Sequence, residues 1–349
     1  MSTHIPRNHA LQPYNLCLVG FGNVGRMFVR LLQEKSATLR ERHGIEWRIT
    51  GLASRRLGWI ADPNGLPPDA LLAGPMPKGV SPEPGDVREW LRAARAHVLF
   101  EATSLDRHHG HPAIDHLKAA LECGAHAISA NKGPIVYAYD ELRALAARTG
   151  KRFLFESTVM DGTPIFNLFR ETLPVVDLRG FRGLLNSTSN VVLTEMERGH
   201  SFEQAVRRAQ EIGVAETDPS DDLEGWDAAV KVAALCTVLM GAPMKPQDVQ
   251  RTGISGLDPA AVRAARAAGK PYKLVCRAQR NAAGVSASVR PEQLPLTDPL
   301  ASLEGTTSCL HFDMDVFNLT ITEQKPGVEA TAYGLLSDFI RAAEEPKQT

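Results

Sequence analysis

A glycine motif near the start of the chain constrains its fold more than any other feature. An apolar run over residues 16–19 ends at Gly20, and Gly20-Phe-Gly22-Asn-Val-Gly25 then leads into apolar residues spaced as on an amphipathic helix. This order of strand, glycine turn and helix is typical of a unit that binds a dinucleotide. Gly20 permits the tight turn, Gly22 lets a pyrophosphate approach the backbone, and Gly25 lets the helix pack on the strand. The free N–H groups at the helix start would hold the phosphates. A glycine-rich turn without a ligand is the alternative.

Strands and helices alternate over the rest of the first half of the chain. Residues 57–86 interrupt the alternation and are rich in proline and glycine, so we expect a long irregular segment there with one short helix. The alternation itself predicts a doubly wound parallel sheet. Its strands are expected at residues 47–53, 97–103, 126–129 and 152–156, and its helices at residues 112–123 and 139–149.

The pattern changes from about residue 158, where helical segments cluster and one of them starts at the capping sequence Ser201-Phe-Glu-Gln204. We therefore expect an α/β protein of two domains. A Rossmann-type, doubly wound dinucleotide-binding domain would span residues 1–157 and be completed by residues 311–349. An α+β domain for substrate binding, catalysis and dimerisation would span residues 158–310.

The end of the second predicted strand bears on which dinucleotide is bound. Sites for NAD usually carry an acidic residue here, whereas sites for NADP often carry an arginine for the 2′-phosphate. The chain has Ser54-Arg55-Arg56 instead of an acidic residue. This favours NADP, with NAD as the alternative if both arginines are only solvated loop charges. The candidate cofactor-binding residues are Gly20, Gly22, Asn23, Val24, Gly25, Ser54, Arg55, Arg56, Thr103, Ser104 and Lys132.

An acidic segment in the second half of the chain points to proton transfer. Residues 213–231 hold six Asp or Glu residues and end at Lys231, the only cation in the apolar stretch 226–240. On a helix, Asp227 and Lys231 are four residues apart and share a face. Low dielectric favours the neutral amine and the carboxylate favours the cation, so such a pair tunes the pKa of the lysine. A solvated helix start explains most of the acidic residues, but it does not explain the lysine.

Composition excludes several classes of protein. The 349 residues carry 39 basic and 40 acidic side chains, a formal net charge of −1, so nucleic acid is not an expected partner. The five cysteines are scattered without C-x-x-C spacing, which favours reduced thiols and a cytoplasmic location. We expect neither a signal peptide in residues 1–15 nor a membrane span, because no apolar run is long enough. His108-His109-Gly-His111 invites a zinc interpretation, but a polar loop is preferred because no four-ligand pattern accompanies it.

Several segments together resemble the homoserine dehydrogenase family. They are the glycine motif, Ala130-Asn-Lys132, residues 156–165, residues 185–190 and, most specifically, the spacing from Glu216 through Asp227 to Lys231. The resemblance runs from about residue 16 to the final predicted helix. The family interconverts L-homoserine and L-aspartate 4-semialdehyde with NAD(P). The chain is similar to the short members, which have no C-terminal ACT domain.

The resemblance also implies roles for individual residues. Lys231 would be the acid and base, and Lys132 would orient the reacting oxygen, on which an ammonium group stabilises charge and to which it supplies a proton. The family further implies a homodimer and a monovalent cation such as Na+, with a capping turn that holds no ion as the alternative. The implied substrate-binding residues are Glu216, Asp222, Asp227, Ser187 and Thr188. The implied cation ligands are the carboxylate of Glu156 and the backbone carbonyls of Val159, Asp161 and Thr163.

One loop departs from the family pattern. The family usually has Gly-Pro-Gly-Ala-Gly before Thr-Ala, and this chain has Glu323-Gln-Lys-Pro-Gly-Val-Glu-Ala-Thr-Ala332 beside the expected cofactor pocket. Two alternatives to homoserine dehydrogenase therefore stay open. One is a dehydrogenase of a different small amino-acid alcohol or semialdehyde, and the other is an NADP-binding regulatory protein without turnover. The retained acids and lysines favour an enzyme, because a regulatory protein needs no proton-transfer groups.

Overall fold

The predicted strand, glycine turn and helix lie at the centre of the first domain. A computed structural model describes residues 12–73, 86–324 and 326–344, and in it β1 (Tyr14–Val19) runs through the turn into α1 (Asn23–Glu34). The first sheet has the order β3-β2-β1-β4-β5-β6, and only β3 is antiparallel to its neighbour. This is the strand order of doubly wound nucleotide-binding sheets. The other strands are β2 (Trp47–Ser54), β3 (Gly58–Leu66), β4 (Val98–Glu101), β5 (His126–Ser129) and β6 (Phe153–Leu154).

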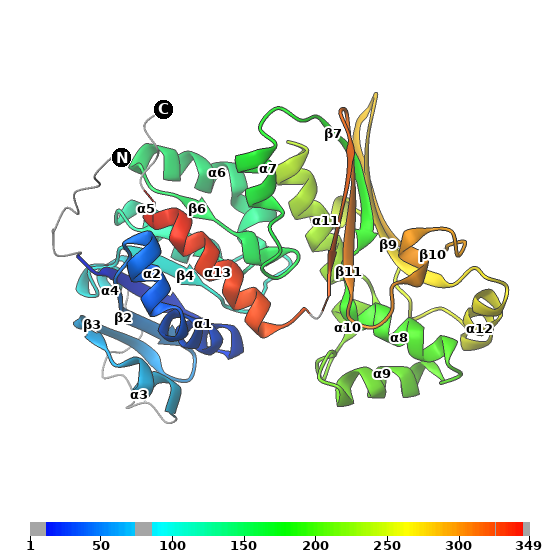
Figure 1. The fold of residues 1–349 in the computed structure, drawn as a ribbon, viewed down its shortest axis with the longest axis horizontal. Coiled ribbons are helices and arrows are strands. Elements are labelled where there is room, and N and C mark those ends of the chain that lie inside the picture. The colour runs from blue at the N-terminus through cyan, green and yellow to red at the C-terminus, as the bar shows by residue number, and fades with distance from the viewer. Residues whose placement is uncertain (1–11, 74–85, 325, 345–349) are drawn as a thin grey trace, which may run out of the picture.

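Alternating side chains of the central strand face two helical layers. Leu16 and Leu18 of β1 pack with α1 and α13 (Val328–Ala343), whereas Cys17 and Val19 pack with the helices on the opposite face. Figure 1 shows α13, in red, lying beside α1, so the C-terminal helix completes the nucleotide-binding domain. The remaining helices here are α2 (Ser36–His43), α3 (Pro68–Ala73), α4 (Val87–Ala93), α5 (Ala113–Glu122) and α6 (Gly133–Thr149).

The segment expected to be irregular contains a strand, so that prediction was wrong for residues 58–66. They form β3, which pairs antiparallel with β2 at the edge of the sheet. An edge strand tolerates Pro63, and aromatic packing holds it in place. The rings of Trp59 and Trp90 meet edge-on at 5.0 Å, and the Trp90 indole donates to the carbonyl of Ile60 at 2.8 Å. The one short helix expected in the segment is α3. Residues 1–11 and 74–85, which include most of the N-terminal segment and Pro82-Glu-Pro-Gly85, lie outside the described residues.

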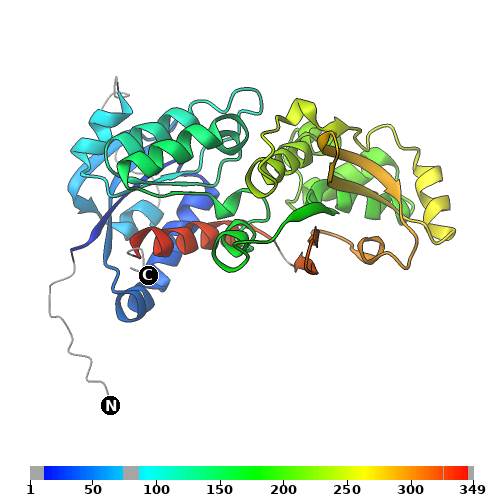
Figure 2. The same ribbon diagram turned by 90° about the horizontal axis from the view of Figure 1, so that it is seen from above.

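The second domain is built on a second six-stranded sheet, in the order β12-β11-β7-β9-β10-β8. Figure 2 shows this domain, coloured from green to orange, beside the nucleotide-binding domain. Its strands are β7 (Leu178–Leu184), β8 (Gln250–Arg251), β9 (Tyr272–Asn281), β10 (Gly284–Gln293), β11 (Ser308–Met314) and β12 (Asn318–Glu323). Helices α8 and α11 pack on β9, and α9 and α12 pack on α8. The helices are α7 (Phe166–Thr172), α8 (Ser187–Glu197), α9 (Phe202–Glu211), α10 (Ser220–Leu223), α11 (Trp226–Leu239) and α12 (Pro259–Ala267), with short 3-10 helices η1 (Glu156–Thr158), η2 (Pro246–Asp248) and η3 (Pro299–Ser302).

The predicted return of the chain to the first domain, at residue 311, falls inside a strand of the second sheet. Residues 308–314 form β11, which pairs with β7 and with β12 in the second sheet. A boundary at residue 311 would therefore cut through β11. The sequence did not reveal this, because the pattern of apolar and polar residues in a strand does not show which sheet the strand joins. We propose a boundary after Glu323, where β12 ends and α13 follows.

No helix in the described ranges is long and apolar enough to cross a membrane.

Candidate active site

The glycine turn offers a cradle for an anionic group. Gly20 has φ +92°, and a Cβ atom there would lie 2.3 Å from the carbonyl oxygen of Ala102. A Cβ atom on Gly25 would lie 2.8 Å from the carbonyl oxygen of Gly20, whereas one on Gly22 would meet nothing within 4 Å. Among the described residues no side chain caps the start of α1, so no side-chain cap occupies its first N–H groups. The backbone thus fits a dinucleotide pyrophosphate.

The turn after β2 begins next to this cradle. Gly20 N donates to the carbonyl of Ala53 at 2.9 Å, and the hydroxyl of Ser54 accepts from Leu57 N at 3.2 Å. Arg55 and Arg56 follow Ser54 and are exposed. Positive charge therefore lies where a ribose of the dinucleotide is expected.

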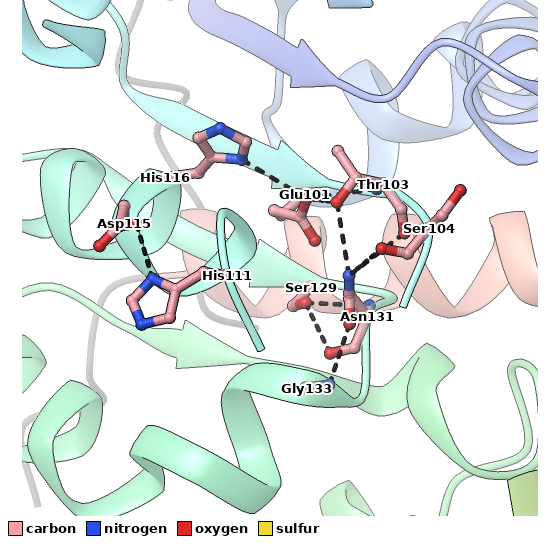
Figure 3. Close-up of polar contacts among 9 residues, drawn as sticks. All are labelled: Glu101, Thr103, Ser104, His111, Asp115, His116, Ser129, Asn131 and Gly133. Atoms are coloured by element: carbon pink, nitrogen blue, oxygen red, sulfur yellow. Dashed lines mark hydrogen bonds and ion pairs between the residues drawn. The ribbon is translucent and has the colours of Figure 1, made fainter. Parts of the chain in front are cut away.

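The carboxyl ends of β4 and β5 are joined through Asn131 (Figure 3). Its side-chain amide donates to the carbonyls of Thr103 and Ser104, each at 3.2 Å. Its side-chain oxygen accepts from Gly133 N at 2.9 Å. Lys132, between Asn131 and Gly133, starts α6. The predicted residues Thr103, Ser104 and Lys132 are therefore brought together beside the glycine turn.

One carboxylate lies between the two predicted lysines. Asp227 Oδ2 is 2.9 Å from Lys231 Nζ, and Asp227 Oδ1 is 3.2 Å from Lys132 Nζ. Lys231 Nζ also donates to the carbonyl of Leu185 at 2.7 Å. The three charged side chains are only 17 to 20% exposed. Lys132 belongs to the nucleotide-binding domain and Lys231 to α11, so the two amines meet at the junction of the domains.

The charges in this cluster stabilise one another. Burial alone would raise the pKa of Asp227, but Lys231 and Lys132 hold that pKa well below its usual range. Burial alone would lower the pKa of Lys231, but the attraction of Asp227 raises it. Lys231 is therefore an ammonium group at neutral pH, ready to donate a proton. It becomes a base only when the pH rises or the negative charge around it is reduced.

A second carboxylate lies behind Asp227. The Asn186 side-chain amide donates to Asp222 Oδ1 at 2.6 Å and to Asp227 Oδ2 at 3.2 Å. The hydroxyl of Thr188 donates to Asp222 Oδ2 at 2.7 Å. Burial and the neighbouring Asp227 raise the pKa of Asp222. Asn186 was not among the predicted site residues, although it stands directly before Ser187 in the sequence.

Within the described residues, two of the predicted substrate residues have no hydrogen bond or ion pair to this cluster. The hydroxyl of Ser187 donates to the carbonyl of Thr306 at 3.1 Å. Glu216 is exposed, and within the described residues its side chain has no hydrogen bond or ion pair, whereas its backbone carbonyl accepts from Gln210. Glu216 is thus free to bind a ligand, but no contact yet ties it to the lysines.

Two carboxylates in the segment predicted to bind a cation act as helix caps, one of them the predicted ligand Glu156. Both carboxylate oxygens of Glu156 accept backbone N–H groups at the start of α7, from Ile165 and Phe166 at 2.6 and 2.8 Å and from Asn167 at 2.6 Å. Asp161, with φ +44°, accepts from Gly327 N at 2.8 Å and from the Thr331 hydroxyl at 3.0 Å at the start of α13. Among the described residues, no group of three or more His, Cys, Asp or Glu side chains could hold a metal ion. The capping alternative therefore accounts for both carboxylates without an ion.

Sequence reasoning missed two further groups near the lysines. Glu323 is 9% exposed, and burial, together with the charge of Asp161, raises its pKa to about 7, against the opposing effects of Thr163 and Lys231. It stands where the chain departs from the family loop, which is the only clue that the sequence offered. Lys325 of that loop lies outside the described residues.

The second missed group is Arg107, which spans the domain junction. It forms an ion pair with Asp221 and lies over the ring of Trp226 at 5.3 Å. Arg251 lies over the same ring at 3.8 Å. Trp226 begins α11, so the contacts of Arg107 hold the helix that carries Asp227 and Lys231 against the nucleotide-binding domain, whereas Arg251 belongs to β8 of the second domain. No sequence pattern links residue 107 to residues 221 and 226.

A dinucleotide cradle next to an amine and carboxylate cluster defines a nicotinamide-dependent oxidoreductase, and comparison with known proteins agrees. Residues 20–156 match the family model described as the NAD binding domain of homoserine dehydrogenase, and residues 164–340 match the model described as homoserine dehydrogenase. The chain belongs to the homoserine dehydrogenase family. It is thus an NAD(P)-dependent oxidoreductase that acts on the CH–OH group of L-homoserine.

Individual relatives align over nearly the whole chain. The NAD(+)-dependent homoserine dehydrogenase of Pseudomonas canavaninivorans is 38% identical over 94% of this chain and 95% of its own. A homoserine dehydrogenase structure from Thiobacillus denitrificans superposes with a TM-score of 0.82 and 28% identity, over 95% of this chain and 73% of that one. A hyperthermophilic archaeal homoserine dehydrogenase mutant in complex with NADPH superposes with a TM-score of 0.79 and 26% identity, over 97% of this chain and 100% of that one.

Proposed function

We propose that Lys231 is the acid and base of the interconversion of L-homoserine and L-aspartate 4-semialdehyde, and that Lys132 orients the reacting oxygen. The observation that carries this proposal is the shared contact of both ammonium groups with Asp227. A nicotinamide, when bound, would supply or take up the hydride. In the reduction, Lys231 gives its proton to the oxygen on which charge builds. In the oxidation, the neutral amine of Lys231 removes the hydroxyl proton.

The acidic residues are proposed to bind the amino end of the substrate. Glu216 is exposed and its carboxylate has no partner in the described residues, so it can pair with the α-ammonium group of homoserine. Asp222 and Asp227 complete the acidic wall around the lysines, and Thr188 fixes Asp222. Ser187 is proposed to contact the substrate from the start of α8.

Substrate choice is tested by assaying a panel of small amino alcohols with both cofactors. Homoserine is expected to give the highest kcat/KM, measured by absorbance at the reduced-nicotinamide band. A different amino alcohol that outperforms homoserine would establish the second candidate substrate class, for which the altered loop at Glu323 is the motivating observation. Cofactor binding without turnover of any compound would leave a regulatory protein.

Cofactor preference is proposed to favour NADP. Arg55 and Arg56 are exposed beside the glycine turn, and β2 ends at Ser54 instead of an acidic residue. The Pseudomonas relative is named for NAD(+), and the archaeal structure is a complex with NADPH, so likeness to relatives does not choose between them.

Substitution of the two arginines tests this preference. We expect Arg55→Ala and Arg56→Ala to raise KM for NADP roughly three- to tenfold and to leave KM for NAD nearly unchanged, because only NADP carries the 2′-phosphate. Initial rates at saturating homoserine would measure both constants. Arg42→Ala, which removes an exposed charge on α2, is a matched control. Equal effects on both cofactors would show that neither arginine contacts the phosphate.

A monovalent cation and a homodimer stay predictions. Na+ at Glu156 would have to take the lone pairs that the backbone N–H groups leave free, together with the carbonyls of Val159, Asp161 and Thr163. Assays in NaCl and in choline chloride at equal ionic strength test this, since equal rates would leave capping as the role of Glu156.

Sedimentation of the purified chain would test the dimer. The five cysteines are all free, which supports the proposed reducing, cytoplasmic location.

A further inference from the structure

The C-terminal end of β4 holds a carboxyl group that the mechanism does not use. Glu101 is completely buried, and its Oε1 accepts from Thr103 N at 3.2 Å and from the Thr103 hydroxyl. His116 Nδ1, on α5, lies 3.6 Å from Oε1 (Figure 3). Within the described residues, Glu101 Oε2 and His116 Nδ1 have no hydrogen-bond partner. Burial of a carboxyl group with so few partners costs folding free energy. The presence of Glu101 here therefore suggests that its contacts to Thr103 have a role.

Hydrogen bonds continue from Glu101 toward the active-site lysine. The carbonyl of Thr103 accepts from the side-chain amide of Asn131 at 3.2 Å, and its hydroxyl oxygen accepts from the same amide at 3.4 Å. Asn131 N donates to the hydroxyl of Ser129 at 3.0 Å, and Asn131 Oδ1 accepts from Gly133 N at 2.9 Å. The backbone is therefore fixed on both sides of Lys132.

Close packing restricts the same turn from the other side. A Cβ atom on Gly133 would lie 2.9 Å from the Cα atom of Gly110, and one on Gly110 would lie 3.0 Å from the carbonyl oxygen of Gly133. The turn that carries Lys132 thus cannot shift toward Gly110 without a steric clash, and it cannot shift away from Asn131 without losing the hydrogen bond of Gly133 N.

Lys132 depends on this restraint because its target belongs to the other domain. Its Nζ lies 3.2 Å from Asp227 Oδ1 on α11, at the end of a flexible side chain. A small change in the direction of the Lys132 Cα–Cβ bond moves Nζ by a larger distance, and a misplacement of 1 Å in an active site can cost a factor of about 100 in rate. Glu101 is itself buried too deeply to touch substrate or cofactor.

We propose that Glu101 is a positioning residue, which fixes Lys132 against Asp227 through Thr103 and Asn131. The inference rests on the role proposed above for Lys132. Since Glu101 acts only through that lysine, its removal has no further effect on the chemical step once the lysine is gone.

A double-mutant cycle tests the proposal. Glu101→Ala is expected to lower kcat, expressed per folded molecule that binds reduced cofactor, roughly 10- to 100-fold. KM for the cofactor is expected to rise by a smaller factor, because Thr103 is itself a candidate cofactor-binding residue. Glu101→Gln keeps an oxygen for Thr103 N and the Thr103 hydroxyl, so it is expected to restore most of kcat. In the Glu101→Ala, Lys132→Ala double variant, kcat is expected to equal that of Lys132→Ala alone.

The outcomes separate this inference from the proposed function. Multiplying effects in the double variant would overturn the positioning role, while an impaired Lys132→Ala variant would still support the role of the lysine. Wild-type kcat in Lys132→Ala would overturn both. Thermal melting checks that the variants fold. If Glu101→Ala does not fold, Asn131→Ala replaces it in the cycle, because this variant removes the next hydrogen bonds between Glu101 and Lys132.

Discussion

Lys231→Ala is expected to lower kcat for homoserine oxidation by roughly 10³-fold, the largest effect of any single substitution in this chain. The ammonium group of Lys231 is held at 2.9 Å from Asp227 and at 2.7 Å from the carbonyl of Leu185. Alanine removes the proton acceptor in oxidation and the proton donor in reduction. The cofactor cradle at Gly20 is untouched, so the dissociation constant of the reduced cofactor, measured by its fluorescence, is expected to stay the same.

Two further substitutions separate charge from proton transfer at this position. Lys231→Met keeps most of the side-chain volume without the amine and is expected to match the alanine variant. Lys231→Arg keeps the positive charge near Asp227, but a guanidinium group does not deprotonate in proteins, so oxidation is expected to stay slow over the whole pH range. An alanine variant that retained more than about a tenth of kcat would show that another group, such as Lys132, transfers the proton.

Much of the fold was predictable because local sequence patterns determine it. The glycine motif occupies the turn for which its spacing is typical, and Ser201 and Gln204 form both hydrogen bonds of the predicted capping box. β3 was missed because its stability comes from contacts distant in sequence, between Trp59 and Trp90. The place of β11 in the second sheet was missed for the same reason, because its pairing with β7 joins residues more than a hundred positions apart.

The candidate site was predictable only where its residues lie close in sequence. Asp227 and Lys231 are one helical turn apart on α11, so their ion pair follows from spacing alone. The contact of Lys132 with Asp227 depends on how two domains meet, and only resemblance to the family indicated it. Arg107 was missed because no sequence pattern marks it. Asn186 precedes Ser187 and Glu323 lies in the altered loop, but the groups that act on their side chains, Asp222 and Asp161, are distant in sequence.

The sequence interpretation of Glu156 and Asp161 shows a different limit. A carboxylate that binds a cation and one that caps a helix both require acceptor oxygens near a turn. The sequence alone could not separate these roles. The structure gives both carboxylates helix N-termini as partners, so an ion is not needed to explain them.

Asp227→Asn is expected to have the second largest effect, a fall in kcat of roughly 100-fold. Asparagine has nearly the same volume as aspartate, but it removes the negative charge that contacts both Lys132 and Lys231, whose ammonium groups then repel each other. The variant is also expected to lose about 2 kcal/mol of stability, less than the cost of breaking a fully buried pair because the site is partly exposed.

The pH dependence of this variant has a definite sign. Asp227 raises the pKa of Lys231 against the effect of burial, so the pKa of Lys231 falls when the carboxylate is removed. Oxidation needs the neutral amine, and its rate therefore rises as the pH passes through that pKa. We expect the alkaline inflection of kcat/KM for homoserine oxidation to move to lower pH in the variant. Asp222→Asn is the matched control and should move it less, because Asp227 contacts Lys231 Nζ directly.

The contribution of Asp227 to the free energy of unfolding is expected to change in the acidic pH range. The pKa of Asp227 is lowered in the folded protein, so its contribution to stability is complete above about pH 5 and is lost as the pH falls below the ordinary aspartate value of about 3.9. Urea unfolding at several pH values is expected to show the full difference between wild type and Asp227→Asn near neutrality and a shrinking difference in acid. A difference in stability that stays constant down to about pH 3 would mean that the two lysines do not stabilise the carboxylate. In the kinetic experiment, an alkaline inflection at the same pH in Asp227→Asn and wild type would mean that Asp227 does not control the pKa of Lys231.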